Sequence, residues 1–351
     1  MPAIDKLHLN ELINQAIKEG ALAIYFNIGS YPVIKINDNL KDLTAKPILT
    51  KEFLNTIADS ILSEEQKERL TSKKEITIAH NWSDDIRFLA NFFYQKNSLS
   101  ITIKLISTQI KDINDLNLPR VINDIIKLEA GLVIVCGPVS SGRSTTINSF
   151  IQYLNKNQEK RIISIEDPIE YEFIDDKSII QQREVGQDVD SFLQGLADVV
   201  DEDVDIVYLS KINNAQEIKL AIQAAASGKL VLAVMDSNSV IVVLNKIYSS
   251  FKISEKELAK SMITNSLKVI INQRLIKKNG GGQILATEVF TMNDSSKSII
   301  KSERFEQLNS VIQTSRGDNM QDLNSSLKEL VSKGLINQEE AEKYITNANN
   351  F

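Results

Sequence analysis

Apolar residues recur with two different periods along the chain, and the first region mixes both. Residues 7–17 repeat apolar positions at helical spacing and stop at Gly20, which predicts an opening amphipathic helix. Two more helices are predicted to begin at Thr50 and Ser63. Five short apolar runs predict strands: residues 21–27, 33–36, 75–80, 86–94 and 100–106. The pattern therefore predicts a small α+β domain over residues 1–106.

Beyond residue 120, short apolar runs alternate with helical stretches. Strands are predicted at residues 133–136, 161–165, 206–209, 230–235 and 284–290. Such alternation is typical of a parallel sheet with crossover helices, so residues 120–351 are predicted to form an α/β domain. The Asp- and Asn-rich segment 107–119 is predicted to be the linker between the two domains.

The last third of the chain is predicted to be mainly helical. Ser254 and Glu257 have capping-box spacing ahead of a long apolar stretch, which predicts a helix over residues 258–276. Two further helices, over residues 320–331 and 337–345, are predicted on either side of Gly334.

Composition narrows the class of protein. The chain has 351 residues, which favours two domains, and its 40 basic and 46 acidic residues argue against a nucleic-acid partner. A single cysteine, Cys136, excludes an intramolecular disulfide and favours a reducing compartment. The two histidines, His8 and His80, are too isolated to suggest a metal site. With neither a leader pattern nor a long apolar run, the protein is predicted to be soluble and cytoplasmic.

Residues 131–148, GLVIVCGPVSSGRSTTIN, carry the main candidate chemistry. Gly137, Gly142 and Ser144 satisfy the phosphate-loop spacing G-x-x-x-x-G-x-[ST] between a buried strand and a helix start. In such a loop, backbone N–H groups cradle phosphates and the hydroxyl reaches Mg²⁺. We therefore predict binding of ATP and Mg²⁺, with Ser144 as the metal ligand. The predicted nucleotide-binding residues are Gly137, Ser140, Ser141, Gly142, Arg143, Ser144 and Thr145.

Arg143 departs from the phosphate-loop pattern, because the motif has lysine at this position. Arginine keeps the positive charge, but its planar guanidinium is bulkier than an ammonium and does not replace it at a close-packed phosphate site. We therefore expect nucleotide binding to be weak.

Three further strings support a family resemblance: ISIEDPIE at residues 163–170, QQREVG at 181–186, and MQDLNSSLKELVSKGLINQEEA at 320–341. With the phosphate loop, they make the chain similar to the secretion ATPase superfamily, and most of all to its PilT-like type IV pilus retraction ATPases. The resemblance covers nearly the whole chain, although the first domain matches mainly through its apolar pattern. It implies a PAS-like N-terminal domain, a RecA-like C-terminal domain and a hexameric ring that binds ATP between the two.

The resemblance also implies partners and a place in the cell. These are a homo-hexamer or a mixed ring with an intact PilT-like relative, and an inner-membrane pilus platform protein at the cytoplasmic face of that membrane. The segment SSKSIIKS, residues 295–302, lies where PilT-like proteins carry AIRNLIRE. It keeps two apolar and two basic positions, so we interpret it as serving a retraction-type role.

The catalytic set of the family is incomplete here. The family string DVILVGEMRD reads DIVYLSKINN at residues 205–214, so Lys211 replaces the glutamate that polarises water. The histidine box GHLVxxTLHT reads GKLVLAVMDS at residues 228–237, where Lys229 and Asp236 replace both histidines. Four family arginines align with Asn97, Lys104, Ala197 and Asp201. Glu166 and Glu170 remain, and by resemblance one of them orients water or Mg²⁺; alternatively, both have a structural role only.

Magnitudes favour an impaired enzyme. A general base contributes about 10²- to 10⁴-fold and an arginine finger about 10³- to 10⁵-fold, so losing both predicts turnover near background. The five acids between residues 198 and 205 add a predicted repulsion of the triphosphate. Three interpretations stay open: a ring subunit impaired in hydrolysis, a fully active hexameric ATPase that drives pilus retraction, and a small-molecule kinase on a P-loop fold. Coincident changes at Arg143, Lys211, Lys229 and Asp236 favour the first.

Overall fold

The structure is a computed structural model that describes residues 3–36, 39–83, 86–106 and 109–345. The chain divides into two compact units, Met1–Gln109 and Ile110–Phe351. Residues 110–119, within the predicted linker, therefore belong to the second unit. There the short 3₁₀ helix Ile113–Leu116 places Ile113 in the same apolar core as helix α5 (Arg143–Asn157). No helix of the described residues is long and apolar enough to cross a membrane.

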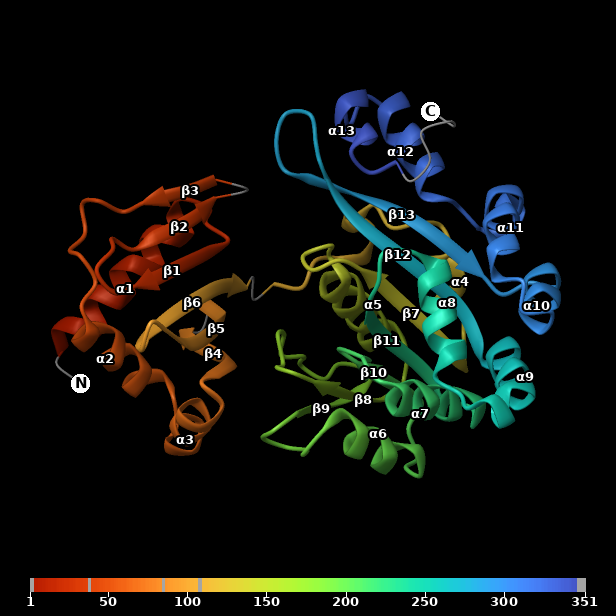
Figure 1. Ribbon diagram of the computed structural model, residues 1–351, viewed down its shortest axis with the longest axis horizontal. Coiled ribbons are helices and arrows are strands. Elements are labelled where there is room, and N and C mark those ends of the chain that lie inside the picture. Colours follow the sequence, from red (N-terminus) through yellow and green to blue (C-terminus); the bar gives the residue numbers. More distant parts are fainter. Residues whose placement is uncertain (1–2, 37–38, 84–85, 107–108, 346–351) are drawn as a thin grey trace. The chain divides into compact units, whose positions relative to one another are not determined.

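The first unit is built on a six-stranded antiparallel sheet (Figure 1). In the order in which they pair, its strands are β3 (Asn39–Asp42), β2 (Val33–Ile36), β1 (Ala23–Asn27), β6 (Ser98–Ile106), β5 (Ile86–Gln95) and β4 (Glu75–Ser83). Its helices are α1 (Ala3–Lys18), α2 (Lys51–Ile61) and α3 (Glu64–Lys73). The side chains of Thr50 and Ser63 cap α2 and α3, as predicted. Strand β3 was missed because all four of its residues are exposed, which leaves no apolar pattern.

The second unit contains the predicted parallel sheet, with one antiparallel strand at its edge. Its order is β13 (Gln283–Thr291), β12 (Leu267–Lys277), β7 (Gly131–Gly137), β11 (Leu230–Asp236), β10 (Ile206–Leu209), β8 (Arg161–Glu166) and β9 (Ile179–Glu184). Only β13 runs antiparallel to its neighbour, β12. Because the other strands are parallel, the carboxyl ends of β7, β11, β10 and β8 lie at one edge of the sheet.

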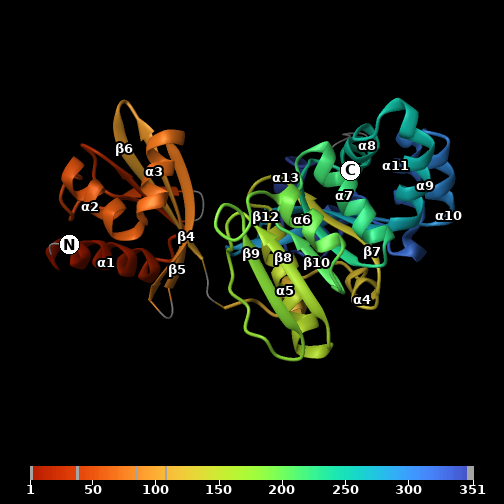
Figure 2. The ribbon, with the colours of Figure 1, turned by 90° about the horizontal axis from the view of Figure 1, so that it is seen from below.

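Helices cover both faces of this sheet, and β7 shows how the sequence assigns them. Leu132 and Ile134 face one core, which includes side chains from α6, α7, α8 and α9, whereas Val133 and Val135 face the core of α4 and α5 (Figures 1 and 2). The helices not yet given are α4 (Ile122–Ile125), α6 (Phe192–Val200), α7 (Ala215–Ala226), α8 (Val240–Ser249), α9 (Lys256–Ser266), α10 (Asp294–Lys301), α11 (Leu308–Thr314), α12 (Leu323–Ser332) and α13 (Gln338–Glu342).

The predicted helix over residues 258–276 is wrong in its second half. Helix α9 ends at Ser266 and the chain continues as β12, between β7 and β13. A central strand is covered on both faces, so its apolar residues run on without alternation and resemble a buried helix in sequence. The predicted capping box is also wrong: α9 has Glu255 as its N-cap without a side-chain bond, and Glu257 pairs instead with Lys260.

Candidate functional site

Gly137 ends strand β7 at a point where no other residue fits. Its φ is +155°, and a Cβ atom there would lie 2.3 Å from Oγ of Ser141 and 2.6 Å from the carbonyl oxygen of Gln273. Both distances are far below van der Waals contact. The chain must therefore turn at a glycine, and the loop folds tightly back against β12.

The loop that follows has the features of a phosphate cradle. Ser140 and Gly142 both adopt left-handed backbone conformations, with φ of 64° and 89°. Gly142 is the N-cap of α5 and supplies no side-chain cap, so the first N–H groups of this 15-residue helix are left to a ligand or solvent. Ser141 is 2% exposed, and its Oγ has no hydrogen-bond partner within the described chain. This geometry fits an anionic group such as a nucleotide phosphate.

The first turn of α5 contains the remaining predicted nucleotide-binding residues, Arg143, Ser144 and Thr145, all half-buried. Nη1 of Arg143 donates a hydrogen bond of 3.0 Å to the carbonyl oxygen of Met235 and forms an ion pair with the carboxylate of Asp236. The guanidinium at the motif's lysine position is therefore held at the end of β11.

Glu166 is the last residue of β8 and Glu170 lies in the segment that follows it. The Glu166 side chain is 1% exposed and accepts hydrogen bonds from Oγ of Ser164 (2.6 Å) and Nε2 of Gln182 (3.0 Å). Burial raises the pKa of Glu166 to about 7, although these two hydrogen bonds oppose the shift. Near neutral pH this carboxyl can therefore either accept or donate a proton.

Two tyrosines interact with residues of this site, and sequence reasoning missed both. The Tyr171 hydroxyl has a hydrogen bond with Thr145 in the first turn of α5. Tyr208, in β10, is fully buried, and burial raises its pKa well above the usual value. The charges of Glu166 and Glu170 raise the pKa of Tyr208 further, whereas that of Arg143 lowers it. In sequence, Tyr208 is simply one residue of an apolar strand.

Gln273 is a third missed contact of the loop. Its Nε2 donates a hydrogen bond of 2.8 Å to Oγ1 of Thr146 in α5, and its backbone carbonyl closes on Gly137. Residue 273 was predicted to lie in a helix, so the strand that brings it beside the loop was not foreseen. No signal in the sequence links it to Gly137.

The segment that directly follows β10 has no acidic residue, and the nearby Glu217 carboxylate accepts hydrogen bonds from the Asn213 and Asn214 N–H groups. Residues 210–214 are Ser, Lys, Ile, Asn and Asn, and the Lys211 side chain is exposed. Oγ of Ser210 accepts a hydrogen bond from the Asp167 N–H, which ties this end to the segment after β8. Lys211, which the resemblance aligns with a water-polarising glutamate, therefore lies at the same sheet edge as the phosphate loop.

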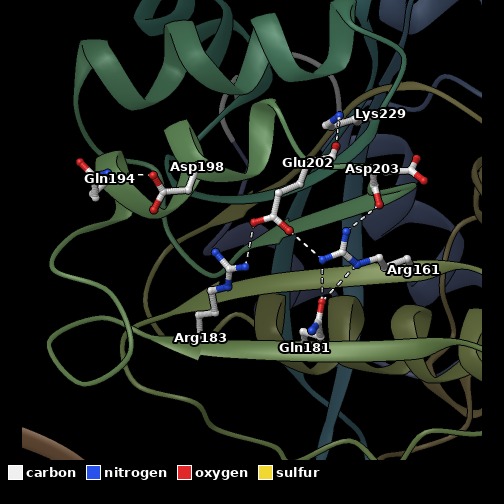
Figure 3. A network of polar contacts seen from close by, with 8 residues as sticks. All are labelled: Arg161, Gln181, Arg183, Gln194, Asp198, Glu202, Asp203 and Lys229. Carbon is white, nitrogen blue, oxygen red and sulfur yellow. Dashed lines mark hydrogen bonds and ion pairs between the residues drawn. The ribbon is translucent and has the colours of Figure 1, made fainter.

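The acidic run between residues 198 and 205 does not neighbour the phosphate loop, which corrects our prediction of repulsion. The acidic run precedes β10, so it lies at the amino ends of the parallel strands, whereas the phosphate loop follows the carboxyl end of β7. The length of the seven-residue strand β7, about 20 Å, therefore separates the run from the loop. Figure 3 shows Glu202 between Arg161 and Arg183, with carboxylate contacts of 2.7 and 2.9 Å. For the same reason Asp203 and Asp205 do not lie beside Lys211.

Two replaced family residues fall at opposite ends of β11. Lys229 comes just before the strand, where its Nζ donates a hydrogen bond of 2.9 Å to the Glu202 carbonyl oxygen (Figure 3). Asp236 ends the strand and pairs with Gly137 of β7. Four aligned positions lie elsewhere: Asn97 and Lys104 in the first unit, Ala197 within α6, and Asp201 at the C-cap of α6. The described residues contain no group of three or more His, Cys, Asp or Glu side chains placed to bind a metal.

Comparison with known proteins identifies the class to which this fold and phosphate loop belong. The profile of the Type II/IV secretion system protein family matches residues 3–280. The chain is 30% identical over 345 residues to the type IV pilus retraction ATPase PilT of Pseudomonas aeruginosa, covering 98% of this chain and all of that protein. It is 29% identical over 318 residues to a twitching motility protein of Neisseria gonorrhoeae, covering 90% and 85% of the two chains.

A solved structure agrees with these matches. The crystal structure of the pilus retraction motor PilT with bound ADP superposes with a TM-score of 0.87 at 32% identity, over 97% of this chain and 98% of that one. The chain is a PilT-like member of the type II/IV secretion system protein family. The predicted fold class, a RecA-like P-loop domain with a smaller N-terminal α+β domain, is confirmed.

Proposed function

We propose that this protein is a component of the type IV pilus retraction machinery that binds Mg-ATP at the phosphate loop and hydrolyses it at or near background. The names of its relatives support the retraction role, and the ADP in the related PilT crystal structure supports nucleotide binding. The observation that carries the impaired turnover is Lys211, an exposed cation at the end of β10.

Nucleotide binding rests on the main chain more than on side chains. The turn at Gly137, the left-handed residues Ser140 and Gly142, and the uncapped start of α5 supply N–H groups whatever the neighbouring side chains are. The Ser144 hydroxyl, at the second helical position, is the proposed Mg²⁺ ligand. ATP supplies the phosphoryl group that the family transfers to water.

Titration calorimetry with Mg-ATP tests this binding. We expect weak but measurable binding heat, a lower affinity in Ser144→Ala, and an unchanged affinity in Ser298→Ala, which replaces an exposed serine on α10. The absence of heat up to millimolar ATP, together with no shift in the thermal unfolding temperature, would end the nucleotide proposal.

Slow hydrolysis follows from the charge on Lys211. The lysine ammonium has three hydrogen-bond donors and no acceptor, so it cannot accept a proton from water. A missing general base alone lowers a rate by about 10²- to 10⁴-fold. We therefore expect phosphate release that is hard to separate from background.

A second candidate, the fully active hexameric ATPase, is favoured by one observation. Glu166 is buried at the end of β8 with a pKa of about 7, which suits a general base near neutral pH. If this carboxyl replaces the family glutamate, turnover is robust in the unmodified protein and lost in Glu166→Gln. Equal, background rates in both would support the impaired enzyme.

We further propose that the protein assembles as a homo-hexamer or in a mixed ring with an intact PilT-like relative, at the cytoplasmic face of the inner membrane beside the pilus platform protein. The similarity to PilT over nearly the full length of both chains supports this. Multi-angle light scattering should find a species of about six chains, alone or after mixing with that relative. A strict monomer under every condition would refute ring assembly.

The segment 295–302, which forms most of α10, is the proposed element of retraction function. Ile300 is fully buried and Ile299 packs against the core, so Ile299→Asp changes stability as well as surface. Lys301 is exposed and gives a cleaner test. We expect Lys301→Glu to lower pilus-dependent motility while the folded fraction is unchanged, and Lys328→Arg to serve as a conservative control on α12.

A further inference from the structure

Two of the replaced family positions contact each other at the phosphate loop. Gly137 pairs with Asp236 across β7 and β11, so the end of β11 lies directly beside the start of the loop. From there the Asp236 carboxylate binds the guanidinium of Arg143, which also donates to the carbonyl oxygen of Met235 at 3.0 Å. A lysine replaced by arginine and a histidine replaced by aspartate thus form one ion pair.

The end of β11 is itself held in place. Nζ of Lys246 in α8 donates a hydrogen bond of 2.7 Å to the backbone carbonyl oxygen of Asp236. Nη2 of Arg274 in β12 donates one of 2.8 Å to the carbonyl oxygen of Asn238, two residues further on. The carboxylate that binds Arg143 therefore projects from a turn fixed on two sides.

The Arg143 side chain is 14% exposed, whereas that of Asp236 is 50% exposed. The arginine is therefore the more confined partner, and both of its contacts with the end of β11 are made by Nη1, so they hold the guanidinium at that end. A phosphate in the loop competes with Asp236 for the same cation.

From this geometry we propose that Asp236 restrains Arg143 and so sets the affinity of the loop for nucleotide phosphates. The inference rests on the proposed function as a nucleotide-binding site and adds the residue that tunes it. Removing the carboxylate releases the guanidinium toward the phosphates. The gain is about fivefold in affinity, the most that a partly exposed ion pair is usually worth.

A simple repulsion between Asp236 and the phosphates is the competing explanation, and a pair of variants separates the two. If Asp236 restrains Arg143, then Asp236→Asn binds more tightly than the unmodified protein and the double variant Arg143→Gln/Asp236→Asn loses that gain. If Asp236 only repels, the double variant keeps most of the gain, because the arginine plays no part in it.

The experiment measures the dissociation constant of a fluorescent Mg-ATP analogue for the full chain and for these variants. Asp203→Asn, which removes an exposed acid at the opposite sheet edge, is the matched charge control and should bind as the unmodified protein does. Asp236→Ser provides a second uncharged replacement if Asp236→Asn folds poorly, as judged by thermal unfolding.

Each outcome decides between the claims. Tighter binding by Asp236→Asn that disappears in the double variant supports the restraint. Unchanged binding, or a gain retained in the double variant, overturns it while nucleotide binding by the natural protein stands. Binding by Asp236→Asn, but by neither the unmodified protein nor the double variant, supports the restraint and refutes natural nucleotide binding, and no binding by any variant overturns both.

Discussion

The two edges of the parallel sheet in the second unit hold their charges in different ways. At the amino edge, Glu202 lies between Arg161 and Arg183, and its charge is matched by groups that also hold β8 and β9 together (Figure 3). At the carboxyl edge, Arg143 pairs with Asp236 beside a loop in which Ser140 and Gly142 adopt left-handed backbone conformations. The ion pairs at the amino edge join neighbouring strands, whereas the ion pair at the carboxyl edge holds the Arg143 guanidinium.

The residues that differ from the family motifs in the sequence analysis fall into two groups, one at each edge of the sheet. Lys229 and the acidic run lie at the amino edge, where they make packing contacts, whereas Arg143, Lys211 and Asp236 lie at the carboxyl edge, where we propose that they affect ligand chemistry. We therefore expect substitutions that look alike in a sequence comparison to have different consequences. The predictions that follow test the contrast at one edge or the other.

Alanine at Gly137 should have the largest effect. Its Cβ would overlap Oγ of Ser141 and the Gln273 carbonyl, so we expect a loss of more than about 3 kcal/mol in the free energy of unfolding. Gly228, at the amino edge, also has a positive φ, but nothing lies within 4 Å of its Cβ position, so Gly228→Ala should cost only about 1–2 kcal/mol. Urea denaturation of both variants checks this, and equal losses would contradict the crowding at Gly137.

Replacing Glu166 by Gln should change the pH dependence of stability. Burial raises the pKa of Glu166 from 4.5 to about 7. The stability that the protein has with this carboxyl protonated is therefore fully present below pH 4.5 and is lost as pH rises through 7. Relative to Glu166→Gln, the unmodified protein should therefore lose on the order of 3 kcal/mol between these pH values. Denaturation of both proteins at pH 4.5 and 7.5 measures the change, and a constant difference would refute the shift.

Replacing Glu202 by Gln should weaken the amino edge and leave the loop alone. Burial opposes ionisation of Glu202, but hydrogen bonds from Arg183 and Arg161 outweigh it and lower the pKa. The stabilisation is therefore present above pH 4.5 and is lost as pH falls through the lowered pKa. We expect a loss of about 1 kcal/mol at pH 7, a smaller one in acid, and less than a twofold change in nucleotide affinity. A large change in nucleotide affinity would contradict the claim that the two edges act independently.

Replacing Asp203 by Asn should have the smallest effect. Arg161 binds the backbone carbonyl of Asp203 at 2.8 Å, which the substitution leaves intact (Figure 3). We expect stability to stay within about 0.5 kcal/mol and affinity to be unchanged, because the exposed carboxylate lies more than a Debye length of about 10 Å from the loop. A clear rise in nucleotide affinity would restore the repulsion that the sequence suggested.

Sequence reasoning found the phosphate loop and its flanking elements because their signal is local. A buried strand, two glycines at fixed spacing and a helix start lie within residues 131–148, and each is set by its own neighbours. The strand that supplies Gln273 was missed, because an apolar run buried on both faces has no period that separates it from a helix.

The partners of the loop were out of reach for a different reason. Arg143 meets Asp236, and Thr145 meets Tyr171, only because the sheet aligns the carboxyl ends of its strands. Knowing that two family residues were replaced did not show that their replacements touch. The predicted repulsion by the acidic run was wrong for the same reason. The sequence gives the number of its charges but not the edge of the sheet at which they lie.

Steady-state phosphate release by the purified, unmodified protein tests the central claim most directly. We expect a rate at or near background that neither Arg143→Lys alone nor the addition of Lys211→Glu raises by more than a few fold, because the histidines and arginines of the family are still missing. Arg143→Ala serves as the control for contaminating ATPases. A robust rate in the unmodified protein that is lost in Arg143→Ala would contradict the account, because it would show that this chain builds a working catalytic site from other residues.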